Sequence, residues 1–225
     1  MKVKFNIVIL SLMITSLGSM SCSEQNKKEE EGKIKVACVG NSITFGHGIE
    51  NREKNAYPAQ LQKILGNEYI VQNFGVSGRT MLKKGDFPYW EENEFEEAQS
   101  FEPDIVIIKL GTNDAKPHNW ELRDNFLKDY ESMINVFKNL PSKPKIWVCL
   151  PAPVFSDESN IRDFVILNGI GPSIREVAGE YNIPVIDFYR IFEGKGDLFP
   201  DTIHPNKAGA KIMAETIAKA ISNVE

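Results

Sequence analysis

The feature that most constrains the fold is the alternation, from residue 34 onward, of short apolar runs with segments of helical period. The runs are rich in β-branched residues and apolar on both faces, as strands of a parallel sheet between two helical layers must be. They occupy residues 34–39, 69–73, 104–110, 145–150 and 183–188. The helical segments are residues 57–65, about 91–101, 122–140, 172–182 and 206–223. This alternation predicts a three-layer α/β/α sandwich around a five-stranded parallel sheet.

The segments that follow the strands carry most of the functional information, because ligands of such sheets bind beyond the carboxyl ends of the strands. The informative segments are GNS from residue 40, NFGVSGRT from residue 73, GTND from residue 111, and DTIHP from residue 201 inside a longer loop. We expect all four to meet at one edge of the sheet.

These segments contain the residue types of a serine hydrolase. A serine hydroxyl is a poor nucleophile at neutral pH unless a base takes its proton and a third group orients that base. Asp201 precedes His204 by three residues, so its carboxylate can hold one ring nitrogen while the other faces Ser42, an accessible loop position. Asp201 is also expected to raise the pKa of His204. Candidate donors to an oxyanion are the backbone N–H groups of Ser42 and Gly78 and the side-chain amide of Asn113.

The same segments resemble a known family. GNSIT, SG at residue 77, GTND and DTIHP resemble, in this order, the four signature blocks of the SGNH hydrolases, the GDSL-like esterases and lipases. The resemblance implies the flavodoxin-like fold of that family and is closest to bacterial carbohydrate O-acetylesterases of the sialate O-acetylesterase and acetylxylan esterase types. Carried over by position, it implies a nucleophile, two oxyanion donors, a base and its orienting acid at Ser42, Gly78, Asn113, His204 and Asp201.

Some details depart from this pattern or have another explanation. Asn41 stands where the family's namesake has aspartate, a variant common in its carbohydrate-esterase branches. Taken alone, Gly78 could mark a left-handed turn, Asp114 a helix cap, and DTIHP the start of the last helix. Their joint placement after successive strands favours catalysis. The elbow of an α/β-hydrolase requires Gly-x-Ser-x-Gly, but residue 44 is threonine.

Other polar residues near these segments are candidates for further roles. The chain has three histidines and lacks His-x-x-x-His and Cys-x-x-Cys spacings, so neither a metal nor an organic cofactor is predicted. His47 lies near Ser42 but has no carboxylate at a helpful spacing, so we interpret it as a loop or pocket residue. Candidate substrate-binding residues are Arg79, His118 and Trp120, for which the alternative is a solvated loop with a packed tryptophan.

The predicted function is the hydrolysis of small acyl esters, O-acetyl esters above all, of carbohydrates. The domain is small, without an obvious lid or long apolar groove, and polar and aromatic residues flank the site. The alternatives are lysophospholipase- or thioesterase-like activity, which other family members carry, and a non-catalytic glycan-binding lipoprotein. The formal net charge is −5, without a long basic run, which argues against nucleic acid as a partner.

The first residues have the pattern of an export signal. Lys2 and Lys4 precede an apolar run too short for a comfortable membrane span, and small residues lead to Cys22. We therefore expect a lipoprotein-type signal peptide over residues 1–22, with a lipid anchor at Cys22, and a polar tether over residues 23–33. The protein is expected to be exported and anchored as a periplasmic or outer-membrane lipoprotein; the alternative is a soluble periplasmic or secreted form.

The esterase domain is expected to span residues 34–225. Within it, Cys38 and Cys149 lie in apolar runs predicted to be strands, where a thiol most often serves as a small buried hydrophobe. Two cysteines within strands of one sheet seldom have disulfide geometry, so both are predicted to be free.

Overall fold

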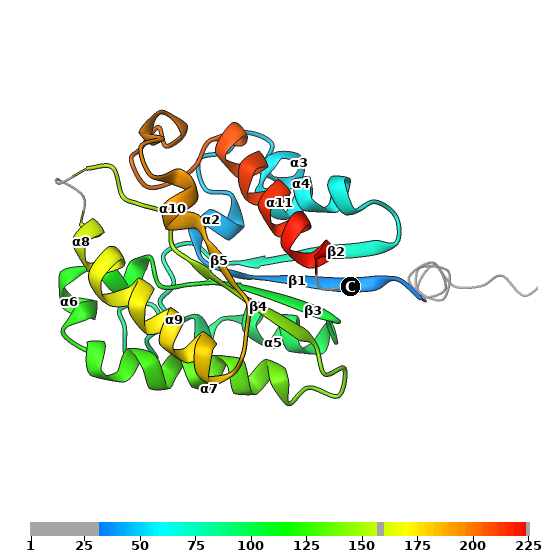
Figure 1. Cartoon of the computed structure of the whole chain (residues 1–225), viewed down its shortest axis with the longest axis horizontal. Coiled ribbons are helices and arrows are strands. Elements are labelled where there is room, and N and C mark those ends of the chain that lie inside the picture. Colours follow the sequence, from blue (N-terminus) through cyan, green and yellow to red (C-terminus); the bar gives the residue numbers. More distant parts are fainter. Residues whose placement is uncertain (1–31, 157–159, 224–225) are drawn as a thin grey trace, which may run out of the picture. The chain divides into compact units, whose positions relative to one another are not determined.

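Five parallel strands form one sheet in the computed structural model, in the order β2-β1-β3-β4-β5 (Figure 1). The strands are β1 (Ile34–Gly40), β2 (Tyr69–Gly75), β3 (Ile105–Lys109), β4 (Lys145–Leu150) and β5 (Val185–Asp187). The structure describes residues 32–156 and 160–223, which lie within one compact unit, Gly32–Glu225. The predicted α/β class and the five-stranded parallel sheet are confirmed.

Helices cover both faces of this sheet, as Figure 1 shows. One layer contains α5 (Asn93–Ser100), α7 (Phe126–Lys138) and α9 (Gly171–Glu180). The other contains α2 (Ser42–Phe45), α4 (Tyr57–Leu65), α10 (Phe188–Phe192) and α11 (Lys207–Ser222). Successive strand residues point to opposite layers: Ala37 and Val39 pack toward α5 and α7, whereas Val36 and Cys38 pack toward α4 and α11. Cys38 and Cys149 are buried and free, as predicted.

The predicted boundaries need two kinds of correction. The last strand is shorter than residues 183–188, because Asp187 begins a helix: its side chain accepts a hydrogen bond from the Arg190 N–H at 3.0 Å and caps α10. Several short segments are also absent from the prediction, because they are too short to show a hydrophobic period. They are α2, α10, α3 (Arg52–Asn55), α6 (Pro117–Trp120), α8 (Asp163–Val165), the 3-10 segments η1 (Tyr89–Glu91), η2 (Asn113–Ala115) and η5 (Gly196–Leu198), and the π-helical η4 (Ile166–Ile170). The 3-10 segment η3 (Arg123–Asn125) lies within the predicted helical segment 122–140, directly before α7.

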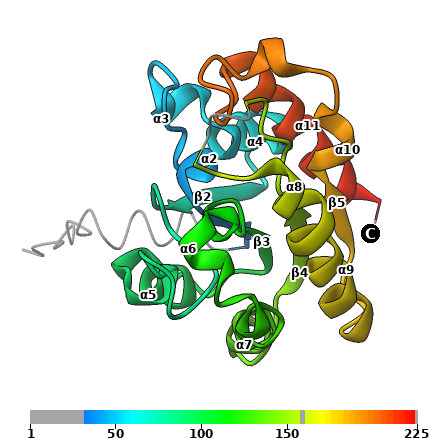
Figure 2. The same ribbon diagram turned by 90° about the vertical axis from the view of Figure 1, so that its left-hand side faces the viewer.

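The carboxyl edge of the sheet carries the segments singled out by the sequence. After β1 the chain crosses to β2 on one side and then returns to β3 on the other, which makes the edge between β1 and β3 a topological switch point. Figure 2 faces this edge, with α2 and α6 in front of the strands. The predicted signal peptide and the predicted tether up to residue 31 lie outside the described residues. Among the residues described, no helix has the length and apolar character needed to span a membrane.

Candidate active site

The turn after β1 holds Ser42 in a defined position. Ser42 is the first residue of α2, and Asn41 caps this helix by accepting a hydrogen bond from the Ile43 N–H at 3.2 Å. The turn is tight at Gly40, where a Cβ atom would lie 2.0 Å from Thr44 Oγ1, so only glycine fits. Ser42 is 7% exposed, which makes it more buried than the accessible loop position that the sequence predicts.

The segment after β5 brings a carboxylate and an imidazole to this serine. His204 Nε2 lies 2.8 Å from Ser42 Oγ, and His204 Nδ1 lies 2.6 Å from Asp201 Oδ2. The other carboxylate oxygen, Asp201 Oδ1, accepts hydrogen bonds from the backbone N–H groups of Ile203 at 3.1 Å and His204 at 2.7 Å. Thr202 between them has φ +69°, a left-handed conformation that closes the turn. The carboxylate, the imidazole and the hydroxyl therefore form one continuous hydrogen-bonded line.

The surroundings of His204 lower its pKa, contrary to the expectation from sequence. Burial is the largest cause; the hydrogen bond and charge of Asp201 raise the pKa, and the neighbouring His47 and Lys109 lower it further. The net result is a pKa below the ordinary value. Burial also raises the pKa of Asp201, but the hydrogen bonds from His204 and Ile203 outweigh it, and this pKa is lowered. At neutral pH the site therefore holds a carboxylate and a neutral imidazole.

The three candidate oxyanion donors lie on two neighbouring loops and the nucleophile turn. Gly78 has φ +82°, which favours glycine, and open space where a Cβ atom would be. Within the described residues, the backbone N–H groups of Ser42 and Gly78 have no hydrogen-bond acceptor. Asn113 Nδ2 donates to the carbonyl oxygen of Arg79 at 3.0 Å, which fixes the amide and leaves its second N–H unused. Each of the three candidates therefore has an N–H that no described residue accepts.

Asp114 has a role that the sequence analysis missed. It is fully buried, and its carboxylate accepts hydrogen bonds from the backbone N–H groups of Met81 at 3.0 Å and Leu82 at 2.8 Å. Burial raises the pKa of Asp114 to about 6, against the lowering effect of these bonds. Asp114 thus ties the loop that carries Asn113 to the segment after Gly78 rather than capping a helix. The only signal in the sequence is its place directly after Asn113.

The candidate substrate-binding residues contact structural partners rather than the Ser42–His204 pair. Arg79 pairs with Glu92 at 2.7 Å. His118 Nε2 lies 3.1 Å from Asp86 Oδ2. Trp120 is partly buried and packs against the core, with its ring centroid 5.8 Å from that of Phe126.

Phe87 was not singled out by the sequence analysis, although it lies near Arg79, the residue that follows Gly78. Phe87 is 54% exposed, and its carbonyl oxygen accepts a hydrogen bond from the Thr80 N–H at 2.9 Å. The Arg79 guanidinium lies 5.6 Å from the ring centroid. The backbone of Arg79 in turn contacts Asn113. Phe87 is thus an exposed aromatic residue that lies near Arg79, whose carbonyl oxygen accepts a hydrogen bond from a candidate oxyanion donor.

His47 lies beside the catalytic histidine candidate. Its ring centroid is 4.6 Å from that of His204. Together with Asp201, these histidines place three potential metal-ligand atoms within 4.8 Å of one another. Both ring nitrogens of His204 already take part in hydrogen bonds, however, so a metal ion here would have to displace Ser42 or Asp201.

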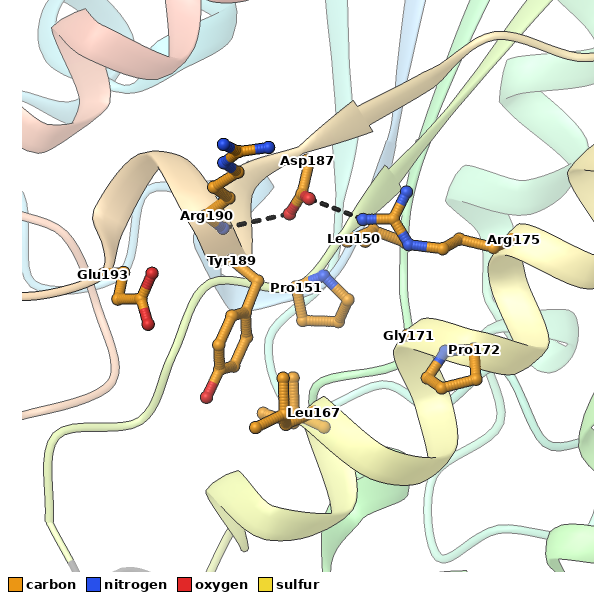
Figure 3. A pocket seen from close by; sticks show the side chains of 11 residues that line it. Leu150, Pro151, Leu167, Gly171, Pro172, Arg175, Asp187, Tyr189, Arg190 and Glu193 are labelled. Carbon is orange, nitrogen blue, oxygen red and sulfur yellow. Dashed lines mark hydrogen bonds and ion pairs between the residues drawn. The ribbon is translucent and has the colours of Figure 1, made fainter.

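A separate cavity of about 250 Å³ lies beyond the carboxyl ends of β4 and β5 (Figure 3). Its walls combine apolar side chains with a charged rim, in which Arg175 pairs with Asp187 at 2.5 Å. The residues that line it are Leu150, Pro151, Ile166, Leu167, Gly171, Pro172, Arg175, Asp187, Tyr189, Arg190 and Glu193. Ser42 and His204 are not among them, so this cavity is distinct from the hydrogen-bonded line.

Comparisons with known proteins agree with this architecture. The chain is 48% identical over 210 residues to an acetylxylan esterase of Xylanibacter ruminicola, a match that covers 85% of this chain and 44% of that protein. The chain thus spans less than half the length of this relative. Among solved structures, the acetyl xylan esterase AlAXEase has a TM-score of 0.67 and 24% identity, covering 84% of this chain and 100% of the other. Est24, a carbohydrate acetylesterase from Sinorhizobium meliloti, has a TM-score of 0.69 and 17% identity, covering 86% and 100%.

At these identities the two solved structures establish the shared fold. The family is established by sequence: the sequence model of the GDSL-like Lipase/Acylhydrolase family matches residues 38–212, which include every segment at the carboxyl edge of the sheet. The chain therefore belongs to the GDSL-like lipase/acylhydrolase family, a family of carboxylic ester hydrolases.

Proposed function

We propose that this domain is a serine esterase that removes O-acetyl groups from a carbohydrate, with Ser42, His204 and Asp201 as its catalytic residues. The observation that carries the proposal is the hydrogen-bonded line from Asp201 Oδ2 through the His204 ring to Ser42 Oγ. This arrangement supplies a nucleophile, a base and an orienting carboxylate in the geometry that acyl transfer requires.

The first half-reaction forms an acetyl-enzyme. Ser42 Oγ attacks the ester carbonyl carbon while its proton passes to His204 Nε2, which is the unprotonated acceptor because Nδ1 donates to Asp201. The tetrahedral intermediate places its negative oxygen near the N–H groups of Ser42, Gly78 and Asn113. When the bond to the sugar oxygen breaks, His204 returns the proton to that oxygen, and the sugar leaves as an alcohol.

The second half-reaction releases acetate. A water molecule takes the place of the sugar alcohol, gives a proton to His204 Nε2 and attacks the acetyl carbon through its oxygen. Collapse of this second intermediate breaks the bond to Ser42 Oγ, which recovers its proton from His204. Throughout, Asp201 remains ionised and stabilises the transient imidazolium, since its pKa is lowered by the bonds it accepts from His204.

Two observations favour a carbohydrate as the leaving group. The first is the 48% identity to an acetylxylan esterase, which concerns only the part of that protein that this chain spans. The second is Phe87, whose exposed ring lies beside the loop of Gly78 and Arg79. An aromatic face can stack on the apolar C–H face of a pyranose, and we propose that Phe87 supports the sugar while its acetyl group enters the oxyanion site.

A substrate comparison tests this function. The purified domain should hydrolyse p-nitrophenyl acetate and acetylated xylan faster than p-nitrophenyl esters of longer acids. O-Acetylated sialic acid and a lysophospholipid complete the set, because they represent the other substrates that the family resemblance implies. Release of fatty acid from the lysophospholipid, without release of acetate from any glycan, would replace the carbohydrate assignment with the lysophospholipase alternative.

We also propose that the protein is exported and anchored through a lipid at Cys22. The support is the sequence alone: two lysines, an apolar run and small residues before the cysteine. A polar tether after the anchor would leave the esterase domain free to reach glycans outside the cytoplasm.

A further inference from the structure

Lys109 is an unusual residue for its position, because it is fully buried at the carboxyl end of β3. Lysine is almost never fully buried without a charged partner. Within the described residues no carboxylate forms an ion pair with Lys109, and its hydrogen bonds go to two neutral oxygens. Nothing in the proposed reaction so far uses this side chain, although the strand that carries it leads directly into the loop that contains Asn113.

The two acceptors of Lys109 belong to the two loops that carry the chemistry. Lys109 Nζ donates to Thr112 Oγ1 at 2.9 Å and, more weakly, to Asn41 Oδ1 at 3.5 Å. Asn41 directly precedes Ser42, and Thr112 directly precedes Asn113. One ammonium group therefore connects the nucleophile turn to the loop of an oxyanion donor.

Asn41 is itself incompletely satisfied. Its Oδ1 accepts from the Ile43 N–H, but its buried Nδ2 has no partner among the described residues. A carboxylate at residue 41, as in the name-giving motif of the family, would accept from Lys109 with either oxygen and leave no amide group unpaired. This chain instead has a neutral residue there, so the positive charge of Lys109 is not neutralised locally.

The charge of Lys109 also acts on the catalytic base. The titratable groups that interact with Lys109 are the Cys149 thiol of β4 and His204. Burial lowers the pKa of Lys109 to about 7, with a small opposing effect from Cys149. Burial raises the pKa of Cys149, so this thiol stays neutral. Below neutral pH, Lys109 is therefore an ammonium, and its charge disfavours a positive charge on His204. His47 acts on the pKa of His204 in the same direction, whereas Asp201 acts in the opposite direction.

We propose that Lys109 is a positioning residue for the reaction: its ammonium group holds Asn41 and Thr112 together, which fixes Ser42 relative to Asn113. The buried charge of Lys109 also adds to the effect of burial, which disfavours protonation of His204. This inference rests on the proposed esterase function. The two parts of the role, the hydrogen-bonded connection and the charge, can be separated by substitution.

Three variants make that separation. Lys109→Met removes the connection and the charge, Thr112→Val removes one hydrogen bond but leaves the charge, and Asn41→Asp adds a carboxylate that neutralises the charge. We expect kcat for p-nitrophenyl acetate to fall about tenfold to a hundredfold in Lys109→Met and to a smaller extent in Thr112→Val, with KM nearly constant, because small misplacements of reacting groups have effects of this size.

The effect of the Lys109 charge on His204 is measured independently of catalysis, by following the titration of the His204 ring with NMR. The chain has three histidines, so the His204 signal can be assigned by substituting the other two. The midpoint should move to higher pH in Lys109→Met and in Asn41→Asp, and it should stay in place in Thr112→Val. Thermal melts establish which variants are folded.

The outcomes distinguish this inference from the proposed function. Folded Lys109→Met with wild-type kcat and an unmoved His204 titration overturns it. If Lys109→Met does not fold, wild-type kcat in Thr112→Val together with an unmoved titration in Asn41→Asp overturns it equally. Ser42→Ala, assayed in parallel, tests the esterase function itself: if this variant stays active, the proposed function fails, whereas the NMR titration still reports on the charge of Lys109.

Discussion

His204 Nε2 lies 2.8 Å from Ser42 Oγ, although 162 residues separate the two along the chain. The contact forms because the segments after β1 and β5 both fold over the carboxyl edge of the sheet, and because Asp201 holds the imidazole at its other nitrogen. The serine proton therefore has a single acceptor whose orientation is already fixed before substrate binds.

The pH dependence of hydrolysis should reflect the buried position of His204. Only the neutral imidazole accepts the serine proton, so kcat/KM is fully present above the pKa of His204 and is lost as pH falls through it. Because burial lowers this pKa, the midpoint of the acidic limb should lie below the ordinary value of 6.5. A midpoint above 6.5 in the measured pH–rate profile would mean that the effect of Asp201 on the pKa of His204 is larger than the effect of burial.

Two alanine variants assign the base. His204→Ala should lose about 10⁴-fold or more in kcat, as in other serine triads. His47→Ala should keep most of its turnover, because its ring contacts His204 but has no hydrogen bond to Ser42. Equal losses in the two variants would contradict the assignment of His204 as the sole base.

Phe87→Ala should weaken the use of glycans without affecting the chemical step. Loss of one stacking face is worth about 1 kcal/mol, or about a fivefold higher KM for acetylated xylan. Hydrolysis of p-nitrophenyl acetate should be unchanged, since this ester has no sugar. Phe164→Ala is the matched control, because Phe164 is 76% exposed on α8. The stacking role is refuted if both variants have the same KM as the wild type.

Asp114→Asn should destabilise the fold and slow the reaction. An amide cannot reproduce two accepted hydrogen bonds, so one of the Met81 and Leu82 N–H groups is left unpaired, at a cost of about 1–3 kcal/mol in the free energy of unfolding. Urea unfolding and kcat measure the two effects. Asp129→Asn is the control, because Asp129 accepts a single backbone hydrogen bond, from Lys83 at 2.9 Å. This substitution should leave kcat unchanged. Wild-type stability and kcat in Asp114→Asn would show that the hydrogen bonds from Met81 and Leu82 to Asp114 are dispensable.

The lipid anchor makes a prediction about location. Full-length protein should sediment with membranes and be released by detergent, whereas Cys22→Ser should either become soluble or accumulate unprocessed. Immunoblots of the soluble and membrane fractions show where the wild-type protein and the Cys22→Ser variant are located. Wild-type protein found entirely in a soluble periplasmic or secreted fraction would refute the anchor while leaving export intact.

The sheet and its large helices could be predicted because their signal is repeated along the chain. Strands buried on both faces have to be apolar throughout, and the segments at their carboxyl ends then have one edge at which to meet. The contacts among Ser42, Asp201 and His204 follow from that edge and from the three-residue spacing of the last two.

Other properties depend on burial, which sequence spacing does not reveal. The spacing of Asp201 and His204 suggests that the pKa of His204 is raised. The desolvation of the buried ring lowers this pKa, however, and is the larger effect. In the sequence, Asp114 is simply the last residue of the GTND segment and Lys109 a residue near the end of a predicted strand. Their importance appears only when the fold buries both completely and places their partners on neighbouring loops.

The most direct measurement of the central claim compares wild type and Ser42→Ala in hydrolysis rate and thermal stability. The substitution removes one hydroxyl that is hydrogen-bonded to His204, so the free energy of unfolding should change by only about 1 kcal/mol. Turnover of p-nitrophenyl acetate and acetylated xylan should fall by several orders of magnitude, because the nucleophile is gone. A folded Ser42→Ala protein that still hydrolyses these esters at the wild-type rate would contradict the account.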